Sequence, residues 1–116
     1  MKLPFLEHAD VPRAKILDYL LNPLHPAGRS KARFFIRLGY TTKRWEHLAE
    51  AFKRHAGVHD VAEIEPDPFG VRYVVEGALE ADGARTANVR VVWFVEKGRS
   101  IPRLISAYPG RKEKTP

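Results

Sequence analysis

Several features are missing from this chain, and each absence excludes a class of protein. The 116 residues contain no cysteine, which excludes a disulfide framework and a zinc site with thiolate ligands. No apolar stretch approaches the roughly 18 residues that a membrane-spanning helix needs, so we expect no membrane partner. The N-terminal sequence has no hydrophobic core of a secretion signal, which predicts a cytoplasmic protein.

The motifs of several common enzyme classes are missing as well. The chain has neither a P-loop nor the glycine pattern of a dinucleotide-binding fold, and it has no Gly-x-Ser-x-Gly elbow. His55 and His59 have i, i+4 spacing, but we expect Gly57 to end their helix between them. We therefore predict no cofactor and no metal site.

Basic residues outnumber acidic ones. Twenty Lys and Arg stand against fourteen Asp and Glu, a formal net charge of +6. This balance favours an anionic partner such as RNA or an acidic protein, although a basic surface that only solvates the domain is the alternative. The candidate RNA contacts cluster in one short stretch: Arg29, Arg33, Arg37, Lys43 and Arg44.

The first half of the chain has helical periodicity. We expect a first helix capped by Asp10 and ended by Asn22-Pro23. A second helix is expected from Ser30, its cap, to Leu38, with Ala32, Phe35, Ile36 and Leu38 as its apolar side and Gly39 after its end. The third is expected to begin at a Thr42 cap and to end at Gly57.

After Gly57 the hydrophobic period changes to two. Strands are expected at residues 61–65, 71–80, 88–96 and 103–108, with turns at 66–70 and 97–100 and an Asp82-Gly83 hairpin signal. The predicted fold class is α+β, with three N-terminal helices packed on a four-stranded antiparallel meander sheet. Residues 1–110 form a single domain in this prediction, and 111–116 form a flexible charged tail.

The last predicted strand carries Arg103 near its start and two hydroxyls, Ser106 and Tyr108, near its end. Under strict alternation Arg103 and the hydroxyls occupy opposite faces. All three face outward only if a bulge or a twist lies between them.

The stretch from His25 to Phe35 combines a histidine, a Pro/Gly turn and Lys31 just ahead of a helix with a basic polar face. The start of a helix offers free N–H groups and a positive dipole end, which attract anions. An imidazole at such a place suits acid–base chemistry on a phosphate ester. The alternative is an ordinary helix start whose loop holds a surface histidine.

These residues together contain the parts for metal-free cleavage of RNA, which needs a base, an acid and cations that stabilise a phosphorane. We assign His25 as acid or base, Lys31 and Arg72 as phosphate ligands, and Ser106 or Tyr108 as the group that positions the substrate. We expect His25 and Lys31 to share one cleft with the outward side of the sheet. A solvated lysine, an ordinary strand arginine and a rim tyrosine are the structural alternatives.

The motif His-Pro-x-Gly-x-x-Lys-Ala-x-Phe-Phe-x-x-Leu-Gly-Tyr at residues 25–40, together with Pro102 to Pro109, resembles an uncharacterised bacterial domain family. Members of that family are short proteins or C-terminal modules of larger toxins. The outline, with Ser106-Ala107-Tyr108-Pro109 in the last strand, also resembles the barnase/EndoU/colicin/RelE-like ribonuclease toxins, many of which have a Thr-Ala-Tyr-Pro-like motif there.

The resemblance implies a toxin-like, metal-independent ribonuclease with RNA as substrate. It also implies a cognate antitoxin or immunity protein, which we expect to be acidic because it would cover a basic cleft. Since a fold does not carry an activity with it, two alternatives stay open. The domain is then either a non-catalytic module that binds nucleic acid or protein through the same basic face, or a structural accessory domain.

Overall fold

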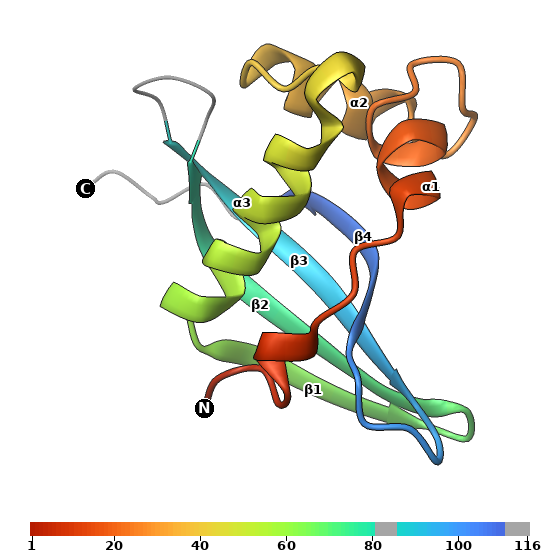
Figure 1. Ribbon diagram of the computed structural model, residues 1–116, viewed down its shortest axis with the longest axis vertical. Helices are drawn as coiled ribbons and strands as arrows, with labels where there is room; N and C mark the ends of the chain where they lie inside the picture. The colour runs from red at the N-terminus through yellow and green to blue at the C-terminus, as the bar shows by residue number, and fades with distance from the viewer. Residues whose placement is uncertain (81–85, 111–116) are drawn as a thin grey trace.

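The computed structural model describes residues 1–80 and 86–110 of the chain. Within these ranges the helical elements precede an antiparallel sheet of order β1-β2-β3-β4, and the predicted α+β meander fold is confirmed (Figure 1). The helical elements are η1 (Leu6–His8), α1 (Arg13–Lys15), η2 (Ile16–Leu20), α2 (Arg29–Arg37), η3 (Thr42–Arg44) and α3 (Trp45–Val58). The strands are β1 (Val61–Asp67), β2 (Gly70–Glu80), β3 (Thr86–Glu96) and β4 (Arg103–Pro109).

The first helix begins later than predicted, because the backbone of Asp10 is used elsewhere. Asp10 N–H donates to the carbonyl of Pro102, and the Asp10 carbonyl accepts from Leu104 N–H, both at 2.9 Å. Asp10 therefore pairs with the start of β4, and the prediction that it caps a helix is wrong. Pro12 is the residue that precedes α1, where its missing N–H costs nothing.

The first helix changes geometry after Lys15. Residues Ile16–Leu20 form a π-helical turn, in which Leu21 N–H donates to the Ile16 carbonyl at 2.8 Å. A π turn is wider than an α turn and occurs often at functional sites. It ends ahead of Asn22-Pro23, as the sequence predicted.

The boundaries of the other two helices are shifted by a few residues. Ser30 is not a cap, because α2 begins one residue earlier, at Arg29. Thr41 rather than Thr42 caps η3, its hydroxyl accepting from a backbone N–H at 3.3 Å. The third helix continues through Gly57 to Val58, since a single glycine costs a helix only about 1 kcal/mol.

The hydrophobic core lies between the helices and one face of the sheet. Its largest fully buried side chains are Ile16, Leu20, Leu21, Phe35, Leu48 and Phe52 from the helical half and Val75, Leu79, Val89, Val91, Trp93 and Leu104 from the sheet. Each such side chain contributes about 1.5–3 kcal/mol when removed from water. Ile36, expected on the apolar side of α2, is instead 47% exposed.

β1 continues past its expected end at Glu65 to Asp67 and includes Pro66. Proline is tolerated there because β1 is an edge strand of the sheet, so a missing N–H breaks no ladder bond. The predicted Asp82-Gly83 hairpin and the predicted tail at 111–116 lie outside the described residues. The β1–β2 and β3–β4 connections project beyond the helical layer (Figure 1).

A β-bulge divides β4 into two parts. Trp93 of β3 pairs with Leu104, and its neighbour Val92 pairs with Ser106, so Ile105 is the extra residue. Leu104 is buried in the core, whereas Arg103 before it is exposed. A bulge of the kind needed for Arg103 and the two hydroxyls to share the outward face is therefore present.

Candidate functional site

Tyr19 is the centre of a polar cluster where η2, the loop before α2 and β4 meet. Its phenol oxygen lies 3.2 Å from Oγ of Ser106, and its ring meets the imidazole of His25 edge to face at 5.0 Å between centroids. The ammonium nitrogens of Lys31 and Lys15 lie 5.3 and 5.5 Å from the Tyr19 ring centroid. The fold thus gathers three predicted site residues, His25, Lys31 and Ser106, around Tyr19. Tyr19 itself was not predicted as a site residue.

The surroundings of Tyr19 lower its pKa. Partial burial alone would raise the pKa, but the Ser106 hydroxyl, the hydrogen bond and charge of Lys31 and the charge of Lys15 together outweigh it by stabilising the phenolate. A lower pKa increases the phenolate fraction near neutral pH. Tyr19 is therefore present more often than an ordinary tyrosine in the phenolate form, which is the form that can accept a proton.

The loop ahead of α2 fixes the tautomer of the His25 imidazole. Its Nδ1 accepts hydrogen bonds from the backbone N–H groups of Ala27 at 3.0 Å and Gly28 at 3.1 Å. Nδ1 therefore carries no proton, and the ring proton resides on Nε2. In this arrangement the imidazole ring offers an N–H donor rather than a basic nitrogen.

Gly28 allows this loop to pack against Tyr19. A Cβ atom at position 28 would overlap the carbonyl oxygen of Tyr19 and touch its ring. Only a residue without a side chain permits the close approach. This contact gives a physical reason for the glycine of the motif at residues 25–40.

A surface cavity of about 630 Å³ opens beside the Tyr19 cluster. Its size is within the range of small-molecule sites in proteins, about 300–1,000 Å³. Tyr19 and His25 line it, and Arg103 and Ile105 reach it from β4. Its other lining residues are Pro12, Ala14, Lys15 and Asp18.

The positive charge of the chain is concentrated in the segment that supplies most of the residues lining this cavity. The segment 11–45 contains eight basic residues and a single acidic residue, a net charge of +7, whereas the rest of the chain has a net charge of −1. The predicted RNA contacts, all exposed on α2 or η3, belong to this segment: Arg29, Arg33, Arg37, Lys43 and Arg44. This uneven distribution makes segment 11–45 the part of the chain that attracts anions.

Two predicted site residues lie elsewhere, on the open face of the sheet, which is the face opposite the helices. Arg72 pairs there with Glu65, with 3.5 Å between Nη1 and Oε2, and both side chains are about half exposed. Tyr108 accepts a hydrogen bond from Nε of Arg90 at 3.4 Å. Neither residue lines the cavity, to which the outward side of the sheet contributes Arg103 of β4 instead.

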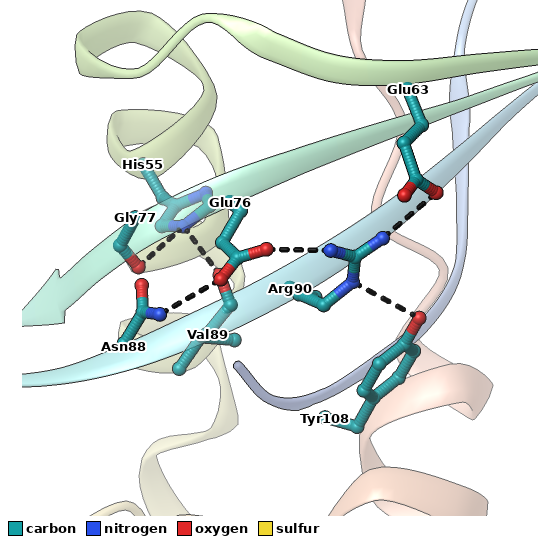
Figure 2. Close-up of polar contacts among 8 residues, drawn as sticks. All are labelled: His55, Glu63, Glu76, Gly77, Asn88, Val89, Arg90 and Tyr108. Atoms are coloured by element: carbon teal, nitrogen blue, oxygen red, sulfur yellow. Dashed lines mark hydrogen bonds and ion pairs between the residues drawn. The ribbon is translucent and has the colours of Figure 1, made fainter. Parts of the chain in front are cut away.

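Figure 2 shows the open-face row, one residue from each strand: Glu63, Glu76, Arg90 and Tyr108. Arg90 contacts Glu76 at 2.5 Å and Glu63 at 2.8 Å, and its side chain is 15% exposed. The Tyr108 hydrogen bond and the two carboxylates raise the pKa of the guanidinium, against the effect of burial. The sequence signal for this row was the placement of Arg90 and Glu76 on the outward face of neighbouring strands.

On the helix side of the sheet, His55 connects α3 to two strands. Its Nε2 lies 3.0 Å from the Gly77 carbonyl and 3.1 Å from the Val89 carbonyl (Figure 2). The side chain is 3% exposed, and its Nδ1 has no hydrogen-bond partner among the described residues. Burial, followed by the charge of His59, lowers the pKa of His55 despite the two carbonyls.

Two further properties concern only the described part of the chain. No three His, Asp or Glu side chains gather there in a group suited to hold a metal ion. No helix there combines the length and the apolar composition that crossing a bilayer requires.

The fold and the cavity define a small α+β domain with a basic polar site beside a sheet edge. The chain belongs to the family described as a domain of unknown function (DUF6883), which matches residues 2–111. A solved contact-dependent growth inhibition toxin–immunity protein complex from Klebsiella pneumoniae 342 contains a chain of similar fold. That chain is 22% identical, with a TM-score of 0.68, and the match covers 92% of this chain and 97% of that one. No curated protein matches the chain.

Proposed function

We propose that this protein is a toxin-like ribonuclease that cleaves RNA by acid–base chemistry at the Tyr19 cluster. The observation that carries the proposal is the Tyr19 phenol, whose pKa is lowered between Ser106 and Lys31 at the edge of a cavity that His25 also lines. The reaction needs no metal ion in this proposal, because lysine side chains supply the positive charge. The similarity in fold to a chain of a toxin–immunity complex supports the toxin-like part.

The proposed reaction assigns one step to each group. Tyr19 phenolate takes the proton of the 2′-hydroxyl while O2′ forms a bond to phosphorus. The bond between phosphorus and O5′ breaks, and O5′ takes a proton from the Lys31 ammonium. Transfer of the phenol proton to the Lys31 amine then restores both groups. The products are a 2′,3′-cyclic phosphate and a 5′-hydroxyl.

The remaining groups stabilise the charge that develops on the phosphorane. His25 donates from Nε2 to a phosphate oxygen, since its Nδ1 is occupied by backbone N–H groups. Lys15 and Arg103, both in the cavity wall, add positive charge. Ser106 keeps the Tyr19 oxygen in place.

The ion pairs of the basic side chains favour the cavity over the open-face row as the reaction site. Arg90 already faces two carboxylates, at 2.5 and 2.8 Å, so little of its charge is available to a phosphate. Lys15 and Lys31 form no ion pair with a described carboxylate and contact the Tyr19 ring instead. An RNA phosphate therefore gains more at the cavity.

The proposed partners follow from the same charge distribution. RNA would approach across the basic segment 11–45, and a cytoplasmic site of action would give access to it. A cognate immunity protein with an acidic surface would neutralise the toxin by covering the cavity and that segment. Steering between opposite charges would make their association fast and sensitive to salt.

The test is cleavage of RNA by the purified chain in the presence of EDTA, with analysis of the new ends. We expect cyclic-phosphate and 5′-hydroxyl ends, and a loss of about 10²–10⁴-fold in rate for Tyr19→Phe, as for other removed acid–base groups. Tyr73→Phe, at a half-buried tyrosine outside the cavity, is the matched control. Binding of RNA without cleavage by the wild type would instead establish the non-catalytic module.

His25→Asn separates the two proposed functions of the imidazole, which are to accept backbone N–H groups at Nδ1 and to donate a hydrogen bond from Nε2. The asparagine oxygen can still accept the N–H groups of Ala27 and Gly28, but the Nε2–H donor is lost. We expect a folded protein with much lower activity that no longer arrests bacterial growth when it is induced. His47→Asn, at an exposed histidine of α3, is the control, and equal activity of the two variants would remove His25 from the site.

A further inference from the structure

Asp18 has the opposite charge to its surroundings. It is the single acidic residue among the described residues that line the cavity, and the single one in the basic segment 11–45. No other described residue forms an ion pair with it. A carboxylate beside a phosphate site weakens phosphate binding, so Asp18 suits another part of an RNA ligand better than its phosphate.

The walls around Asp18 suit a nucleobase. Pro12, Ala14 and Ile105 supply apolar surface, and the Tyr19 and His25 rings supply faces and edges for stacking. Proteins recognise single-stranded RNA mainly by stacking splayed-out bases on such surfaces and by bonding to their Watson–Crick edges. At about 630 Å³ the cavity has room for a nucleotide.

A carboxylate distinguishes between the four bases by its two acceptor oxygens. The Watson–Crick edge of guanine carries two adjacent donors, N1–H and the N2 amino group, which match both oxygens. Adenine and cytosine present one amino group next to an acceptor, and uracil presents one N–H between two acceptors. We infer that Asp18 selects guanine as the base held in this cavity, next to the cleaved phosphodiester.

This inference rests on the proposed function for the position of the phosphate, but it can be tested without cleavage. The probe is guanosine 3′-monophosphate, compared with adenosine 3′-monophosphate by titration calorimetry. We expect the wild type to bind the guanine nucleotide at least about tenfold more tightly, within the range for a bidentate base contact. Asp18→Asn should lose that ratio. Asp60→Asn, the same change at an exposed carboxylate outside the cavity, should keep it.

The outcomes separate the two proposals. Equal binding of both nucleotides, no binding of either, or an unchanged ratio in Asp18→Asn overturns guanine selection. Cleavage of RNA without preference for guanine also overturns it and leaves the proposed function in place. Selective binding of the guanine nucleotide by a protein that cuts no RNA supports Asp18 as the selecting residue and overturns the ribonuclease proposal.

Discussion

The hydroxyls of Tyr19 and Ser106 lie 3.2 Å apart, although 87 residues separate them in the chain. One belongs to the π-helical turn η2, and the other follows the extra residue of the bulge in β4. Both elements depart from regular geometry at the place where they meet. Irregular backbone of this kind is common next to active sites. Here it brings a residue of the N-terminal helical part into contact with a residue of the last strand.

Removing the Ser106 hydroxyl should move the pH dependence of cleavage. Because Ser106 helps to lower the pKa of Tyr19, Ser106→Ala raises that pKa towards its ordinary value. The base is active as phenolate, so the rising limb of the rate profile should shift to higher pH. Rates measured across the pH range check this, with Ser100→Ala, at an exposed serine of a turn, as the control. Identical profiles for the two variants would show that Tyr19 is not the base.

Two glycine-to-alanine changes should act in opposite directions. Gly28→Ala places a Cβ against Tyr19 and displaces it from Ser106, so we expect both lower thermal stability and loss of cleavage. Gly57→Ala lies within α3, where the new Cβ meets only Leu6 at an ordinary 3.5 Å. It should stabilise the protein by about 0.5–1 kcal/mol through helix propensity. Thermal unfolding of both variants is the measurement, and similar effects would contradict the prediction.

Acidification should destabilise the protein through His55. Its pKa in the folded state is below the unfolded value of 6.5, so the unfolded chain takes up the proton first. The stabilisation is complete above about pH 6.5 and is lost as the pH falls through the folded-state pKa, by about 1.4 kcal/mol per unit of difference. Urea unfolding of His55→Gln should show a flatter pH dependence than that of the wild type. His47→Gln should retain the wild-type dependence, and a parallel result for both variants would exclude His55 as the cause.

Binding to single-stranded RNA should depend on salt through the basic segment. Each lost phosphate contact reduces the slope of log affinity against log salt by about 0.7. Arg33→Ala/Arg37→Ala on α2 should therefore lower both the affinity and the slope. Lys97→Ala/Arg99→Ala, which removes two exposed charges from the β3–β4 turn, should change neither by as much. Affinity that does not vary between about 50 and 200 mM salt would rule out the electrostatic footprint.

Periodicity and turn residues predicted most of the fold. The change from helical to alternating periodicity after Gly57 predicted the α+β class. The positions of Arg103, Ser106 and Tyr108 indicated that a bulge or a twist was needed for all three to face outward, and the structure has the bulge. The helix starts were less accurate, because capping depends on contacts that the local sequence does not contain. Asp10 pairs with β4 across the molecule, and no local pattern reveals that pairing.

The candidate site was predicted only in part, because it too depends on contacts between residues that are far apart in the sequence. His25 and Lys31 lie in one motif, and both lie next to the Tyr19 ring. Tyr19 was missed because it lies in a stretch of apolar helical residues, where a tyrosine has the periodicity of a core position. Its contact with Ser106 depends on the π turn and on the bulge, and residue spacing cannot predict a combination of two irregularities.

The open-face row of Glu63, Glu76, Arg90 and Tyr108 takes one side chain from every strand, so it forms only when all four are aligned. A slip of one residue turns each side chain to the other face. Charged groups would then lie among the core side chains, where an unpaired charge costs several kcal/mol. The row therefore ties the register of each strand to Arg90, because a slip of any one strand breaks the contact between that strand and the guanidinium.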